Sequence, residues 1–112
     1  MDFRFDSYGK AKGVVVLTGR LDLLAAADLR ARLQQLVAEG KNQLVVDLEA
    51  VSFIDSSGLG GLIGGLKAAR VAGGDFRIAR PSEQVRYVLQ VSTLDRVLTP
   101  YKSIDEAFAG YR

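Results

Sequence analysis

Short strand-like and helix-like segments alternate along the whole chain, and this alternation restricts the fold more than any other feature of the sequence. The β-branched run 14–18 and the nearly continuous apolar run 44–48 are typical of buried strands. Apolar residues recur at helical spacing over residues 25–39 and again over about 57–71. Such alternation favours an α/β fold in which helices pack on a sheet.

The remaining segments complete the pattern. Residues 3–6 and 76–79 alternate as short strands, and Pro81-Ser82-Glu83 opens a third helix. The apolar side of that helix is predicted to hold Val85, Val88, Leu89 and Val91, and a last short strand to contain Leu94, Val97 and Leu98. Ser103 and Glu106 have capping-box spacing and start a final helix. We therefore predict a single domain over residues 1–112, with a mixed, mainly parallel sheet and about four helices.

Composition excludes several classes of function. The chain has no cysteine and no histidine, so disulfides, imidazole general bases and the usual zinc sites are excluded, and we expect no metal or cofactor. The net charge is +2 and the basic residues do not cluster, which argues against nucleic-acid binding. The longest apolar stretch, 59–66, is far shorter than the roughly 20 residues of a membrane span. With charged residues near Met1 and no signal peptide, we expect a cytoplasmic protein that does not insert into membranes.

Five glycines lie between positions 58 and 65 of the second predicted helix. Each costs a helix about 0.5–1 kcal/mol relative to alanine. Helical spacing places Leu59, Leu62, Ile63 and Leu66 on one face and Gly60, Gly61, Gly64, Gly65 and Ala68 on the opposite face. The glycine face suits either close packing against another helix of the domain or docking of a partner protein. Because the leucine face already supplies a buried side, we favour an exposed, partner-binding surface formed by Gly60, Gly61, Gly64 and Gly65.

The segment Asp55-Ser56-Ser57-Gly58 stands at the start of this helix. Asp and Ser both cap helices, so a purely structural role is one interpretation. A nucleophilic serine is disfavoured, because the chain has no histidine and no Ser-x-x-Lys motif. A phosphate loop is also disfavoured, because Leu66 stands where lysine would follow Gly65. The role that needs a hydroxyl but no catalytic machinery is acceptance of a phosphoryl group, which a helix N-terminus stabilises.

In this context, the sequence resembles a known family. Asp55-Ser56-Ser57-Gly58-Leu59-Gly60, preceded by Val45-Val46-Asp47-Leu48 and Phe53-Ile54, is similar to the signature of the STAS domain of bacterial anti-sigma factor antagonists. Leu17-Thr18-Gly19-Arg20-Leu21-Asp22 resembles a second block of that family, and Gly73-Gly74-Asp75-Phe76 its later strand entry. The resemblance runs over about residues 3–108. Two positions depart from the pattern: Arg20, where the family often has Glu, and Ser92-Thr93-Leu94, where it usually has Gly after the third helix.

The resemblance implies a role for each residue of the motif. Ser56 is the implied phosphoacceptor, Asp22 is the acidic residue implied to lie beside it, and Asp55, Ser57 and Gly58 are its neighbours. The implied protein is a non-enzymatic regulator of transcription that works by partner switching. In its unphosphorylated form it would bind an anti-sigma factor that is also a serine kinase, and so free the sigma factor. Phosphorylation would end that binding, and a serine phosphatase would restore it.

Two alternatives remain open at the level of sequence. One is a STAS scaffold subunit of another signalling or lipid-transport assembly, in which Ser56 is structural. The other is an enzyme such as a weak nucleotide hydrolase, which the missing histidine, cysteine and phosphate loop disfavour.

Overall fold

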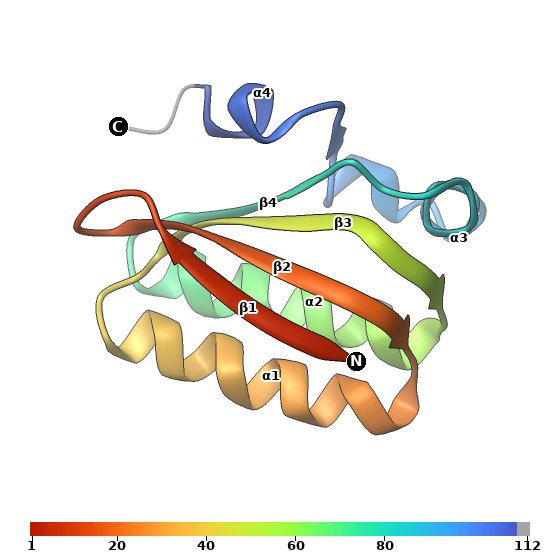
Figure 1. Ribbon diagram of the computed structural model, residues 1–112, viewed down its shortest axis with the longest axis horizontal. Coiled ribbons are helices and arrows are strands. Elements are labelled where there is room, and N and C mark those ends of the chain that lie inside the picture. Colours follow the sequence, from red (N-terminus) through yellow and green to blue (C-terminus); the bar gives the residue numbers. More distant parts are fainter. Residues whose placement is uncertain (110–112) are drawn as a thin grey trace.

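A five-stranded mixed sheet forms the centre of the computed structural model, which describes residues 1–109 (Figure 1). The elements follow in the order β1 (Asp2–Ser7), β2 (Lys12–Leu21), α1 (Leu23–Ala38), β3 (Gln43–Ile54), α2 (Ser56–Val71), β4 (Asp75–Ala79), α3 (Glu83–Val91), the 3₁₀ helix η1 (Leu94–Arg96), β5 (Pro100–Tyr101) and α4 (Ile104–Phe108). The strands lie in sequence order. β1 pairs antiparallel with β2, and every later pair is parallel. The predicted α/β class and the mainly parallel sheet are confirmed.

Helices cover the two faces of the sheet unequally. α1 and α2 lie side by side along one face, while the short α4 lies over the other and α3 packs beside the C-terminal half of β3 (Figure 1). The main core fills the space between the sheet and the α1–α2 pair, and it includes Leu29, Leu33, Leu62 and Leu66. A smaller cluster under α4 contains Val14, Val45, Ala79 and Ala107. The predicted central strand 44–48 is buried along its whole length, because it has helices on both sides.

One charged residue of β3 is buried in this arrangement. Asp47 is 4% exposed and accepts hydrogen bonds from Arg80 Nε at 3.1 Å and Nη2 at 2.6 Å, while Arg80 Nη1 reaches Glu49 at 2.9 Å. The hydrogen bonds to Asp47 raise the pKa of Arg80 above its ordinary value. Arg80 has a positive φ of 54°, a conformation that non-glycine residues rarely adopt. Fixing the guanidinium over an otherwise uncompensated buried carboxylate explains why this strain is tolerated.

Three details of the sequence prediction are wrong. β3 continues to Ile54, well beyond residue 48, and Val91 is 66% exposed instead of facing the core. Leu94 and Val97 are not in a strand: Thr93 takes a left-handed conformation (φ 58°) after α3 and leads directly into η1. Leu98 is nevertheless buried, and the last strand follows at Pro100–Tyr101. Thr93 thus occupies a backbone geometry suited to the glycine that the family usually has after this helix.

Candidate functional site

The C-terminal ends of β2 and β3 bring two helix N-termini together. Leu21 pairs with Ile54 in the parallel ladder, and the Asp55 N–H donates to the Leu21 carbonyl at 3.4 Å. The residues that follow the two strands, Asp22 and Asp55, are the N-caps of α1 and α2. Asp22 Oδ1 accepts the Ala25 N–H at 3.2 Å, and Asp55 Oδ1 accepts the Gly58 N–H at 2.9 Å. The edge of the sheet therefore carries two adjacent, carboxylate-capped positive helix ends.

Ser56 is the first residue of α2 and lies exposed at this edge. Asp55 does the capping, so the structural role that the sequence allowed for Ser56 is already filled by its neighbour. Within residues 1–109, no hydrogen bond holds the Ser56 hydroxyl. Ser57, in contrast, is half-buried. Of the two serines, Ser56 is thus the more exposed.

Gly58 explains how the two helix ends come so close. It is buried, and a Cβ at this position would overlap the Leu21 carbonyl oxygen and lie 2.9 Å from side-chain atoms of Leu21 and Ile54. The contact with Leu21 is to backbone, which cannot swing aside. Glycine is therefore required at position 58, because any side chain there would prevent β2 and α2 from approaching each other so closely.

The predicted exposure of the glycine face is wrong for two of its four members. Gly61 and Gly65 are buried: a Cβ at Gly61 would lie 3.4 Å from the Ala26 carbonyl oxygen of α1, and one at Gly65 would lie 2.6 Å from Leu33 and 2.8 Å from Phe76. Gly65 lets α1 and β4 pack closely against α2, whereas a Cβ at Gly61 would make an ordinary contact with α1. The reason is geometric, because α1 and the sheet contact two different sides of α2 and together cover more than the leucine face.

Gly60 and Gly64 form a second row with Ser56 at helical spacing of four residues. They are half-buried, and among the described residues the Arg30 side chain of α1 comes nearest, 3.7 Å and 3.3 Å from Cβ positions built on Gly60 and Gly64. Arg30 is itself exposed. This row, which we call the outer row (Ser56, Gly60 and Gly64), is the part of the predicted docking surface that remains accessible.

Arg20 also lies at this edge, next to the Asp22 cap. Its guanidinium stacks over the Phe53 ring at 4.2 Å from the centroid, and its Nε is 3.8 Å from Asp22 Oδ2. The Arg20 side chain is 62% exposed, so its charge is displayed beside the capped helix ends. The positive charge of Arg20, which the sequence singled out, is thus exposed at this edge.

Several residues of this edge were not predicted from the sequence. Gln84 of α3 accepts the Ile54 N–H at 2.9 Å and donates to the Ile54 carbonyl at 3.3 Å, which fixes α3 to the end of β3. Leu23 and Leu24, at the start of α1, are 68% and 87% exposed. A hollow of about 420 Å³ adjoins them, lined by Met1, Arg20, Asp22, Leu24, Ala25 and Asp28. The detectable signal was that Leu23 and Leu24 fall outside the helical spacing of Ala25, Leu29 and Leu33, whereas nothing marked Gln84.

Comparison with known proteins agrees with this geometry. Residues 6–107 match the model of the STAS domain, and the chain belongs to the STAS domain family. It is 35% identical over 78 residues to a Thermotoga maritima protein that carries the provisional name anti-sigma factor antagonist, a match that covers 70% of this chain and 69% of that protein. It is 30% identical over 95 residues to the anti-sigma F factor antagonist of Lysinibacillus sphaericus, covering 84% and 81% of the two chains.

The solved structures show the same fold over almost the whole chain. The anti-sigma factor antagonist SpoIIAA in its unphosphorylated form superposes with a TM-score of 0.81 at 28% identity, covering 96% of this chain and 93% of that one. The phosphorylated form of the Bacillus protein SpoIIAA gives a TM-score of 0.73 at 27% identity, with 96% of both chains covered. Among residues 1–109 of this chain, no helix has the length and apolar character needed to cross a membrane.

Proposed function

We propose that this protein is an anti-sigma factor antagonist whose partner binding is controlled by phosphorylation of Ser56. The observation that carries the proposal is the position of Ser56: exposed, without a hydrogen bond in the described chain, and first in a helix that Asp55 already caps. The naming of its STAS relatives and the existence of SpoIIAA in phosphorylated and unphosphorylated forms support it.

The proposed switch follows from the charge at this edge. A phosphoryl group adds about −1.5 to −2 charges and three acceptor oxygens. The free N–H groups and dipole of α2 stabilise that charge, so phosphorylation leaves the fold intact. A partner seated over Ser56 would have to desolvate the new charge close to the carboxylates of Asp22 and Asp55. Phosphorylation therefore removes the partner, and a phosphatase restores binding.

In this proposal, the unphosphorylated protein binds an anti-sigma factor with serine kinase activity in the cytoplasm. Gly58 lets the start of α2 lie close to the end of β2, and Asp22 caps α1 beside it. The outer row together with exposed Leu24 offers the docking surface. Arg20 adds a positive charge beside this surface and selects a partner that presents an acidic group there. The competing scaffold role, with Ser56 structural, is less well supported because Asp55 performs the capping.

Mass spectrometry of the protein isolated from its host tests the proposal. The tryptic peptide 42–67 contains Ser52, Ser56 and Ser57, so fragmentation within this peptide must assign the phosphate. We expect phosphate on Ser56.

The Ser56→Ala variant is expected to lose the phosphate, to retain the partner permanently and to change the free energy of unfolding by less than about 0.5 kcal/mol. The matched control, Ser57→Ala, should still be phosphorylated. Phosphate retained in Ser56→Ala, or a phosphate-free protein that captures no anti-sigma factor, would contradict the proposal.

A further inference from the structure

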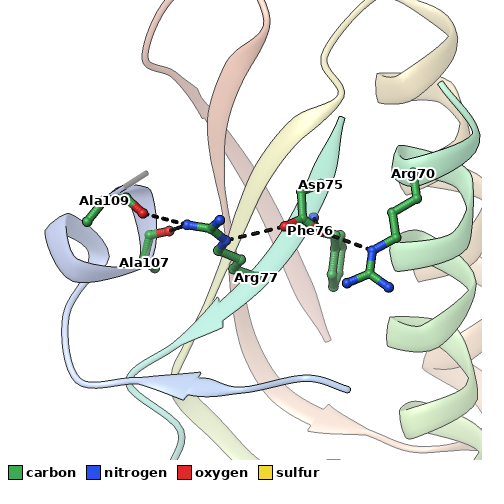
Figure 2. Close-up of polar contacts among 6 residues, drawn as sticks. All are labelled: Arg70, Asp75, Phe76, Arg77, Ala107 and Ala109. Atoms are coloured by element: carbon green, nitrogen blue, oxygen red, sulfur yellow. Dashed lines mark hydrogen bonds and ion pairs between the residues drawn. The ribbon is translucent and has the colours of Figure 1, made fainter. Parts of the chain in front are cut away.

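Three arginines gather beside one carboxylate at the end of the sheet opposite to Ser56. Arg70 comes from the last turn of α2, Arg77 from β4 and Arg96 from η1, while Asp75 is the first residue of β4. Figure 2 shows Arg70 and Arg77 on either side of Asp75. All four side chains line one hollow of about 160 Å³.

Both oxygens of the Asp75 carboxylate already have partners. Asp75 Oδ1 accepts the Phe76 N–H at 2.8 Å and Arg70 Nε at 3.3 Å, and Oδ2 is 3.4 Å from Arg77 Nε (Figure 2). Arg70 and Arg77 each contact Asp75 through Nε alone. Both distances are at the long end for a hydrogen bond, and neither contact is a bidentate pair. Among the described residues that line the hollow, three arginines face one carboxylate, so the charges of this lining sum to a surplus of two.

The arginines differ in how firmly they are held. Arg77 is anchored, because its Nη1 donates to the Ala107 carbonyl at 2.9 Å and the Ala109 carbonyl at 2.7 Å (Figure 2). Within residues 1–109, the Arg96 side chain makes no hydrogen bond or ion pair, and the Nη atoms of Arg70 make none either. Thr99, which also lines the hollow, likewise has a hydroxyl that bonds to no described residue. Donors without a partner in the described residues therefore come from α2 and from the stretch between η1 and β5, and they line the same space.

We propose that this hollow is a binding site for a small oxyanion, namely free phosphate or the phosphate group of a small monoester. The planar guanidinium presents pairs of N–H donors that match phosphate oxygens, and a dianion balances the surplus of two charges. The volume sets the size of the ligand. It is below the roughly 300–1,000 Å³ of pockets that enclose drug-sized molecules, so the hollow can enclose a phosphate group but not a nucleoside as well. This site does not depend on phosphorylation of Ser56.

Titration of inorganic phosphate into the ¹⁵N-labelled protein, followed by NMR, tests the site. Ionic strength is held constant with sodium chloride, because added salt alone screens surface charges. We expect saturable shifts of the amides of residues 75–77 and 96–99, and the same shifts with sulfate. Arg96→Gln removes one charged donor, and it should weaken phosphate binding about tenfold or more. Because Arg96 makes no contact that the fold needs, its variant should melt at the wild-type temperature.

Arg86→Gln is the matched control, since it removes one exposed arginine from α3, away from the hollow. It should leave the affinity for phosphate unchanged within about twofold. The proposal fails if phosphate causes no saturable shift at constant ionic strength, or if both variants weaken binding equally. Binding to vesicles containing phosphatidic acid, without binding of free phosphate, would also overturn the proposal, because the ligand would then be a lipid surface.

Discussion

The two rows of small residues on α2 look alike in sequence but behave differently in the structure. The inner row (Gly58, Gly61 and Gly65) is buried against β2, α1 and β4. A Cβ would overlap backbone at Gly58 and press on core side chains at Gly65, whereas at Gly61 it would make an ordinary contact with α1. The outer row is accessible, and among the described residues the atoms nearest to Cβ positions on its two glycines belong to the flexible Arg30 side chain. The inner row therefore sets how closely the helices and strands pack, whereas the outer row is free to serve a partner. Whether a glycine is required depends on what its missing side chain would touch.

Gly58→Ala should have the largest effect. Its Cβ would overlap the Leu21 carbonyl oxygen, and backbone at the end of β2 cannot move without shifting the β2–β3 pairing. Overpacking costs typically 1–3 kcal/mol and sometimes more, and we expect a loss of about 3 kcal/mol or more in the free energy of unfolding. Urea denaturation measures it. Wild-type stability would show that the two helix ends are not locked together as described.

Gly65→Ala should destabilise the protein less. Its Cβ would press on Leu33 Cδ1 and Phe76 Cε2, which are side-chain atoms in a packed core and can adjust in part. The overpacking cost is offset by about 0.5–1 kcal/mol of gained helix propensity, which leaves an expected net loss of about 1–2 kcal/mol. Thermal and urea denaturation of Gly65→Ala and Gly58→Ala side by side would test this order. A stabilised Gly65→Ala variant would mean that the inner row ends before this residue.

Asp55→Ala tests whether Asp55 alone caps α2, next to the exposed Ser56 of the outer row. Removing the carboxylate leaves the Gly58 N–H without its partner, and loss of a cap costs about 1 kcal/mol. Ser56→Ala is the matched control and should cost almost nothing in the same urea titration. Equal losses in both variants would show that Ser56 shares the cap, which would favour the scaffold role for this serine.

Periodicity was sufficient to predict the order of strands and helices, because each element buries its own apolar stripe. Residues 44–48 illustrate this: a nearly continuous apolar run, interrupted by Asp47 alone, has few places in an α/β domain other than the centre of the sheet. The end of β3 could not be predicted in the same way. Residues 49, 50 and 52 are exposed and read as a loop, but pairing with β2 continues through them to Ile54.

The motif was sufficient to place Ser56 and Asp22 at one edge, since both directly follow parallel neighbouring strands. It could not show which side of α2 was covered. A helical wheel gives the angle of Gly61 and Gly65 around the axis, but not the position of α1, which lies against them. It also could not show that Asp55 alone caps α2, because Asp and Ser both suit that position. Both facts arise from tertiary contacts between segments distant in sequence.

Gly64→Ala should have the smallest effect on stability and the opposite sign. A Cβ here would lie 3.3 Å from Arg30 Nε, and an exposed arginine can move by the few tenths of an ångström required. The gain in helix propensity then dominates, and we expect stabilisation by about 0.5–1 kcal/mol. The same substitution in an Arg30→Ala background should give at least as large a gain if Arg30 is the only obstacle. A lower melting temperature in both backgrounds would show that Gly64 is packed like the inner row, and the two rows would then not differ.

If a partner docks closely on the outer row, the methyl group added by Gly64→Ala should also weaken its binding by about 1–3 kcal/mol, or roughly five- to a hundredfold, in titration calorimetry. A more stable protein with weaker binding is a combination that Gly58→Ala and Gly65→Ala cannot produce, because overpacking at these two positions lowers stability.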